Sequence, residues 1–144
     1  RKSDAFVGEL MENLSVLTIS AKVIALITLL GASVALLNVM LVSVTERTNE
    51  IGLRKAMGAT KKNILSQFLI EAIVICQFGG ALGIILGLFV GNILSTLAFK
   101  AGFVVPWSWV IVGVIACFAV GIGAGYYPAR RAAGVDPIES LRHI

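Results

Sequence analysis

The sequence predicts an all-α, polytopic membrane protein with three transmembrane helices. Of its 144 residues, 58% are hydrophobic and only 14% are charged, whereas a soluble domain averages about 25% charged residues. The charges are also segregated, because residues 23–45, 72–99 and 101–129 contain none. Each of these runs exceeds the roughly 20 apolar residues that cross a bilayer core as a helix. Three buried helices in one small soluble chain are a much less favoured interpretation.

Residues 4–22 are predicted to form an amphipathic helix that leads into the first span, 23–45. Ser3 or Asp4 can cap its start, and apolar residues recur at helical spacing at Phe6, Leu10, Leu14 and Leu17. Two interpretations stay open: a helix lying on the lipid surface, or an extracytoplasmic stalk that continues the span out of the membrane.

The second span is predicted within residues 61–99 and the third within 106–128. A helix over 61–99 would be about 60 Å long, twice the thickness of the bilayer core, so its first turns project or the helix breaks. Pro106 suits a first helical turn. Two aromatic pairs mark the two membrane interfaces of the third span: Trp107 with Trp109, and Tyr126 with Tyr127. Cys76 and Cys117 are expected to be packing residues.

Positive charges predict the orientation of the chain. Residues 46–62 and the tail 130–144 hold most of the Lys and Arg side chains, and the loop between the second and third spans holds only Lys100. By the positive-inside rule, the first two segments are cytoplasmic. The net charge of +4 is read as topological and does not suggest nucleic acid binding.

The polar segment 46–59 is predicted to be a short helix of mixed polarity. Gly58 can end it and Thr60 can cap the next helix. Glu50 stands at helical spacing from Arg47 and Arg54, so both pairs are candidates for weak ion pairs. A solvated loop whose basic residues only set topology is weighed equally.

Two further polar features lie near the membrane boundary. Glu71 is expected to sit at the headgroups and pair with a lysine, although an intramembrane acid is a functional candidate by default. In the tail, Asp136, Pro137 and Glu139 resemble a capping box that starts a short terminal helix. Local order at the membrane surface is favoured for that helix over a second contact with the partner of segment 46–59.

Small residues predict close helix packing. Glycines recur every four residues in the second span, and the third span offers two more; the set is Gly79, Gly83, Gly87, Gly91, Gly121 and Gly125. Such spacing lets another helix approach closely. Packing between the second and third spans is the favoured interpretation, and a sliding or dimer-forming contact is the alternative.

No catalytic constellation is visible, so the chain is not expected to be an enzyme or to bind a cofactor or metal. The glycines lack the strand context of a nucleotide motif. The polar residues within the spans are too few and scattered to line a conducting channel.

Two long motifs resemble the MacB/FtsX-like ABC transporter permeases, a mechanotransmission (type VII) family. They are NVMLVSVTERTNEIGLRKAMGATKKNILSQFLIEA at 38–72 and GYYPARRAAGVDPIESLRHI at 125–144. The resemblance implies four spans per subunit, so this chain, which does not begin with Met, is expected to be the C-terminal part of a permease. The first span and an extracytoplasmic domain would precede it.

The resemblance also implies partners. Segment 46–59 would be a coupling helix that docks on an ABC nucleotide-binding domain, which would bind ATP and Mg²⁺ in a fused or separate chain. A second permease copy or paralogue would complete a dimer in the bacterial inner membrane, with an extracytoplasmic adaptor as a further partner. The coupling contacts would fall on Glu46, Arg47, Glu50, Ile51, Gly52, Leu53, Arg54, Lys55, Met57 and Gly58.

The resulting hypothesis is that Ile51, Leu53 and Met57 form the apolar anchor of this contact, and that Gly52→Leu abolishes ATPase coupling. The work done outside the membrane is not specified, since macrolide or toxin export, lipoprotein release and cell-wall regulation all fit. The alternative is a structural or regulatory membrane subunit with no ATPase.

Overall fold

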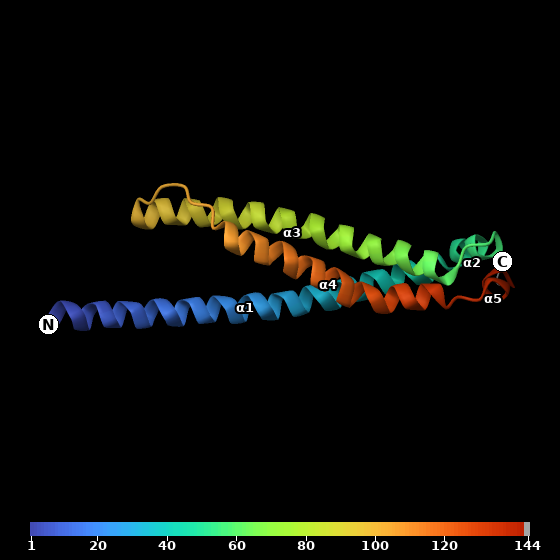
Figure 1. Cartoon of the computed structure of the whole chain (residues 1–144), viewed down its shortest axis with the longest axis horizontal. Coiled ribbons are helices and arrows are strands. Elements are labelled where there is room, and N and C mark those ends of the chain that lie inside the picture. Colours follow the sequence, from blue (N-terminus) through green and yellow to red (C-terminus); the bar gives the residue numbers. More distant parts are fainter. Residues whose placement is uncertain (143–144) are drawn as a thin grey trace.

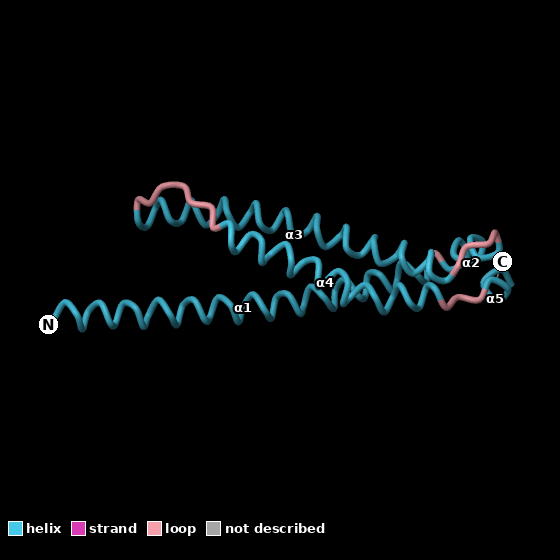
Figure 2. The backbone as a smooth tube through the Cα atoms, viewed as in Figure 1, coloured by secondary structure: helices cyan, strands magenta, loops and turns pink. Residues whose placement is uncertain are grey.

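The computed structural model describes residues 1–142, and within them every regular element is a helix (Figure 2). In chain order these are α1 (Lys2–Glu46), α2 (Thr48–Ala56), α3 (Lys61–Phe99), α4 (Trp107–Ala133) and α5 (Pro137–Arg142). Three of them, α1, α3 and α4, are long and apolar enough to cross a membrane. The predicted all-α fold with three spans is confirmed.

The stalk segment and the first span form one helix. α1 has 45 residues, which corresponds to about 68 Å at 1.5 Å per residue. The part of α1 before Lys22 runs clear of α3 and α4 in Figure 1, and its apolar stripe is uncovered by this chain, as the 62% exposure of Phe6 shows. The N-terminal part of α1 therefore has the shape of a stalk that continues the first span. That it works as an extracytoplasmic stalk stays a prediction.

α3 is also unbroken, and the following loop turns back along it. Its 39 residues correspond to about 58 Å. The backbone N–H of Val104 donates to Asn92 Oδ1 at 2.9 Å, and Asn92 Nδ2 donates to the Val104 carbonyl at 3.1 Å. These two bonds bring the loop back beside the last turns of α3 before α4 begins. The C-terminal end of α3 therefore extends past the part of the helix that packs on α4, whereas the start of α3 lies beside the end of α4.

The buried core lies in the half of the bundle nearest α2 and α5. α4 is the central helix of this half, since it packs on both α3 and α1. Its contact face is made of small residues, all buried: Gly121, Ala124, Gly125, Pro128, Ala129, Ala132 and Ala133. The larger core side chains come from the other helices: Leu36, Met40, Val44, Ile51, Ile64 and Phe68. Small residues on one helix let its neighbours approach closely.

α4 continues past the proline that was expected to end the third span. Pro128 lies inside the helix, which runs on to Ala133. A proline removes one helical N–H donor and costs stability, but Pro128 is buried among the side chains of the core. Packing on both sides therefore offsets the local preference for a break.

The glycines divide into two groups. A Cβ at Gly121 would lie 2.9 Å from the Cα of Ile73, and one at Gly125 would overlap Ala72. These two glycines therefore make the close α3–α4 contact that was predicted.

The stripe in α3 does not take part in that contact. A Cβ added at any of its members, Gly79, Gly83, Gly87 and Gly91, would meet no atom within 4 Å. Gly80 faces α4 instead, beside Cys117. The favoured interpretation of the stripe as packing between the second and third spans is thus not what the structure shows. A contact with another helix stays a prediction.

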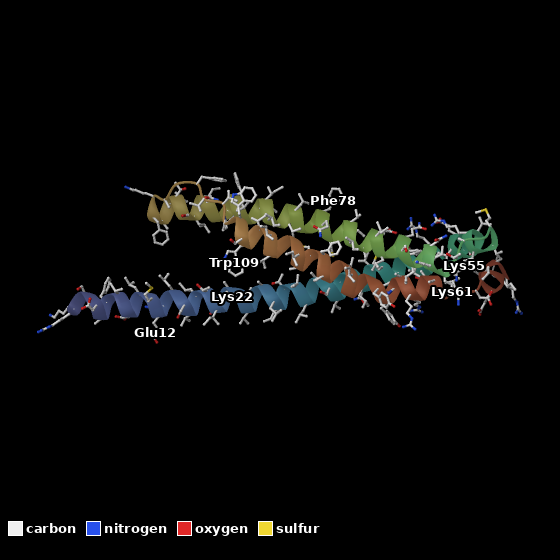
Figure 3. The ribbon with its side chains drawn as sticks, viewed as in Figure 1. Glu12, Lys22, Lys55, Lys61, Phe78 and Trp109 are labelled. Atoms are coloured by element: carbon white, nitrogen blue, oxygen red, sulfur yellow. The ribbon has the colours of Figure 1, made fainter. Side chains whose placement is uncertain are left out.

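A cation–π contact aligns α1 with the start of α4. Lys22 Nζ lies 5.6 Å from the centre of the Trp109 ring, and Figure 3 shows the two labelled side chains on facing helices. Amphipathic Trp and Lys side chains are typical of a membrane interface. We therefore expect one membrane interface near the level of Lys22 and Trp109.

We expect Gly125→Ala in the full protein to weaken the α3–α4 contact by about 1–3 kcal/mol, because overpacking a tight contact has that cost. Gly123→Ala is the matched control, since a Cβ at Gly123 meets nothing within 4 Å and alanine favours a helix by up to about 1 kcal/mol over glycine. Thermal unfolding in detergent should show a lower midpoint for Gly125→Ala alone. Equal midpoints would contradict the packing described here.

Candidate functional site at the hinge end

Four segments meet at the hinge end of the bundle, defined here as α2, α5, the start of α3 and the end of α4. Figure 1 shows α2 and α5 side by side at this end, and the two helices are in direct contact. This end also holds most of the charged side chains of segment 46–59 and of the tail.

The coupling-helix candidate is shorter than predicted. Glu46 belongs to the last turn of α1, and Arg47 is the junction residue before α2, with φ −99° and ψ 13°. Gly58 follows α2 with a φ of +104°, a conformation that favours glycine. Thr60 then caps α3, because its hydroxyl accepts a hydrogen bond from the Asn63 N–H at 3.2 Å. The predicted cap residues at both positions are confirmed.

α2 is anchored to its own chain through Ile51 and Gly52. Ile51 is 1% exposed and belongs to the core. A Cβ at Gly52 would overlap the Ser140 side chain and lie 3.7 Å from the Cα of Pro137. Gly52 is therefore the point where α5 approaches the backbone of α2.

This geometry corrects the expected composition of the partner-facing surface. Ile51 and Gly52 face α1, α5 and the core, so neither can offer an apolar anchor to another protein. Leu53 is 52% exposed, Met57 is 73% exposed, and Ile138 of α5 is 79% exposed. The uncovered apolar surface at this end thus comes from α2 and α5 together.

The charged residues of the hinge pair over longer distances than predicted. Arg47 Nη1 lies 3.3 Å from Glu71 Oε2, and the two side chains are 42% and 36% exposed. Within residues 1–142, neither Glu50–Arg47 nor Glu50–Arg54 forms an ion pair. Glu71 thus pairs with an arginine at the end of α1 where a lysine was expected. Glu46 and Glu50 are exposed.

Lys55 connects α2 to the end of α4. Its ammonium donates to the carbonyl oxygens of Ala133 and Val135, which lie where α4 leaves its final carbonyls without helical partners. Burial lowers the pKa of Lys55 from its ordinary value, and the charge of Lys61 lowers it further, whereas Asp136 acts in the opposite direction. Sequence reasoning placed Lys55 on the partner surface, because no sequence signal links α2 to a helix end about 80 residues away.

The terminal helix begins as predicted. Asp136 Oδ1 accepts a hydrogen bond from the Ile138 N–H at 2.9 Å, and Pro137 is the first helical residue. Ser140, 4% exposed, packs toward Gly52. The described helix ends at Arg142, and residues 143–144 of the predicted tail lie outside the described residues.

The hinge end offers surface chemistry for binding a protein or a charged group. Open hollows surround α5, the largest lined in part by Thr48, Arg131 and Asp136. Within residues 1–142, no group of three or more His, Cys, Asp or Glu side chains is placed to hold a metal ion.

Comparison with known proteins gives one consistent result. The model of the FtsX-like permease C-terminal family matches residues 22–137. Among curated proteins, the macrolide export ATP-binding/permease protein MacB of Campylobacter jejuni is 40% identical over 96% of this chain. The proteins of that name from Psychrobacter cryohalolentis and Mannheimia succiniciproducens are 41% and 47% identical over 98% and 82% of it.

The match covers only part of each relative. This chain spans 22%, 21% and 18% of the three proteins' lengths, respectively. The relatives are named for both ATP-binding and permease functions, and the matching family model describes the permease C-terminal part.

We expect Lys55→Met to loosen the hinge, because methionine keeps an apolar stem and removes the donor to two carbonyls. Loss of a charge-assisted hydrogen bond costs about 1.5–3 kcal/mol, so amide exchange in α2 and α5 should accelerate at least about tenfold. Arg54→Met is the control, since within residues 1–142 the Arg54 side chain has no hydrogen bond. Hydrogen exchange by mass spectrometry measures both, and unchanged rates in Lys55→Met would refute the connection.

Proposed function

The chain belongs to the FtsX-like permease family, and we propose that it is the C-terminal transmembrane part of an ABC transporter permease whose hinge docks on a nucleotide-binding domain. The observation that carries this proposal is the exposure of Leu53 and Met57 on a helix that is otherwise held firmly by its own chain. Large apolar side chains that stay exposed together on the surface of a protein mark a site of interaction with another protein or with a membrane.

Family membership and three apolar helices make this a multi-pass protein of the bacterial inner membrane. We place the hinge end in the cytoplasm, where nucleotide-binding domains reside. The clustering of Lys and Arg at this end supports that orientation through the positive-inside rule. The N-terminal half of α1 then projects on the opposite side of the membrane as a stalk.

The proposed docking face is smaller than the set of residues inferred from the resemblance. It consists of Leu53 and Met57 of α2 with Ile138 of α5, flanked by Glu46, Glu50 and Arg54. The apolar side chains would supply most of the affinity, and the flanking charges, of which Glu46 and Glu50 are exposed and Arg54 is half-buried, would set register and specificity. Ile51, Gly52 and Lys55 act behind this face, because they hold α2 to the bundle.

Movement of α2 would reach all three spans through separate contacts. Lys55 joins it to the end of α4, and Ile51 joins it to the shared core. Arg47, at the junction of α1 and α2, pairs with Glu71 of α3. Because α1 continues without a break into the stalk, a displacement at the hinge can be carried along one rigid helix to the far side of the membrane.

The remaining components of the transporter are part of the same proposal. ATP hydrolysis would occur in a nucleotide-binding domain, fused or separate, and this chain would bind no nucleotide. A second permease copy would complete the dimer, and the outward-facing glycine stripe of α3 and the apolar stripe of the stalk are surfaces on which it could pack. Macrolide export is the working assignment of the transported class, taken from the relatives' names.

Photo-crosslinking in native membranes tests the docking face. Probes replace Leu53 and Met57, and a control probe replaces Phe78, which is 71% exposed in the apolar middle of α3. We expect the hinge probes to capture an ABC nucleotide-binding domain, to an extent that changes with ATP, and Phe78 to capture lipid. Capture of lipid alone at all three positions would favour a structural subunit with no ATPase.

Leu53→Ser with Met57→Ser should uncouple the transporter while leaving its fold intact. Burying a large apolar side chain contributes about 1.5–3 kcal/mol, so stimulation of ATP hydrolysis by the permease should fall at least about tenfold. Gly52→Leu is a weaker test than the sequence suggested, because it would also displace α5. Unchanged stimulation in the double variant, with normal membrane insertion, would exclude these residues as anchors.

A further inference from the structure

A basic hollow lies between the start of α3 and the end of α4, and Tyr126 is one of the residues that line it. It has a volume of about 450 Å³, and its lining includes Lys61, Lys62 and Arg130. Leu65 and Tyr126 supply an apolar and an aromatic wall. Among the described residues 1–142, no Asp or Glu side chain lines it.

The three cations of this hollow differ from Arg47, Lys55 and Arg131 at the hinge end. Arg47 pairs with Glu71, and Lys55 donates to two carbonyls. Arg131 lines a different hollow that contains Asp136 and Glu139. Within residues 1–142, Lys61, Lys62 and Arg130 form no ion pair and donate no side-chain hydrogen bond.

No ion pair neutralises the positive charge gathered here within residues 1–142. Lys61 also lines a neighbouring hollow that contains Asp136. Figure 3 shows Lys55 and Lys61 at the same end of the bundle, and Lys61 contributes to lowering the pKa of Lys55. Like charges brought this close repel one another, and an anion between them would relieve the repulsion.

The hollow also lies at a membrane boundary. At 1.5 Å per residue, Arg130 is about 31 Å along α4 from Trp109, which is the thickness of a bilayer core. Trp109 marks the other interface through its contact with Lys22. No charged residue occurs in α4 before Arg130. The Arg130 side chain therefore reaches the headgroup level, and Leu65 lies beside it.

We propose that this hollow binds the phosphate headgroup of an anionic membrane lipid, with Lys61, Lys62 and Arg130 as the phosphate ligands and Leu65 and Tyr126 against the upper acyl chain. Arginine and lysine are the side chains that bind phosphate, and basic pockets between transmembrane helices are typical sites for anionic lipid headgroups. The site adjoins the hinge without including the docking face. It therefore does not depend on the ATPase contact.

Bound lipid would stabilise the junction of α3 and α4 at the point where α2 attaches. The lipid phosphate would bridge the first turn of α3 and the last turns of α4 through three cations, while Lys55 joins α2 to the carbonyls at the end of the same helix. Anionic lipid in this leaflet would thus stabilise the contact between the start of α3 and the end of α4, to which α2 is attached.

Native mass spectrometry of the full protein, released from nanodiscs of phosphatidylcholine with 20 mol% cardiolipin or phosphatidylglycerol, tests the proposal. Arg130→Gln and the double variant Lys61→Gln/Lys62→Gln are compared with Arg131→Gln, which removes the same charge from the neighbouring position. Each cation near a membrane surface contributes about 1 kcal/mol, equivalent to roughly fivefold in affinity. We expect retained anionic lipid to fall about fivefold in Arg130→Gln and more in the double variant, with Arg131→Gln unchanged.

Two further arms identify the source of the anion. Inorganic phosphate added at millimolar concentration to protein in pure phosphatidylcholine should not produce the thermal stabilisation that cardiolipin produces. Equal stabilisation by free phosphate, equal lipid loss in Arg130→Gln and Arg131→Gln, or unchanged lipid retention in Arg130→Gln would each overturn the lipid assignment. Failure of the docking experiment at Leu53 and Met57 leaves these readouts unaffected.

Discussion

The close approach of α1 and α3 to the small-residue face of α4 is the constraint on which the rest of the structure depends. Gly121, Gly125 and the buried alanines leave no side-chain bulk on α4, so large apolar residues of the neighbouring helices fill the space. In a bilayer, packing of this kind replaces the hydrophobic effect as the force that holds helices together. Because the buried core lies in the half of the bundle nearest α2 and α5, the hinge end is firmly packed, whereas the part of α1 before Lys22 extends alone.

That asymmetry suits a device that transmits movement. The packed half brings together the end of α1, the start of α3 and the end of α4. α2 and α5 pack against each other at this end. The contact between Gly52 and Ser140, the Lys55 bonds to two carbonyls and the Arg47–Glu71 pair are all made between segments distant in the chain. A force applied to the exposed side chains of α2 would be distributed over every helix, and the unpacked stalk would be free to follow.

Local chemistry accounts for what could be predicted of the hinge. Thr60 and Asp136 were recognisable as caps and Gly58 as a helix stop, because these roles depend on backbone groups within three residues. Pro128 shows the limit of such reasoning, since its local tendency to end a helix is overridden by burial on both sides. The glycine stripe of α3 shows it again: the spacing identified a groove, but the spacing cannot say which helix faces it, and α4 packs beside it, on Gly80.

The three spans, their order, the membrane setting and the family could all be predicted from the sequence alone. Each of these follows from composition over about 20 residues or from motifs that are continuous in the chain. Only the tertiary structure decided which hinge residues face inward. Ile51, Gly52 and Lys55 share a short segment with Leu53 and Met57, and nothing in their spacing separates them. Ile51, Gly52 and Lys55 hold α2 in place because α5 and the end of α4 pack against this side of α2. These contacts join residues about 80 positions apart in the chain.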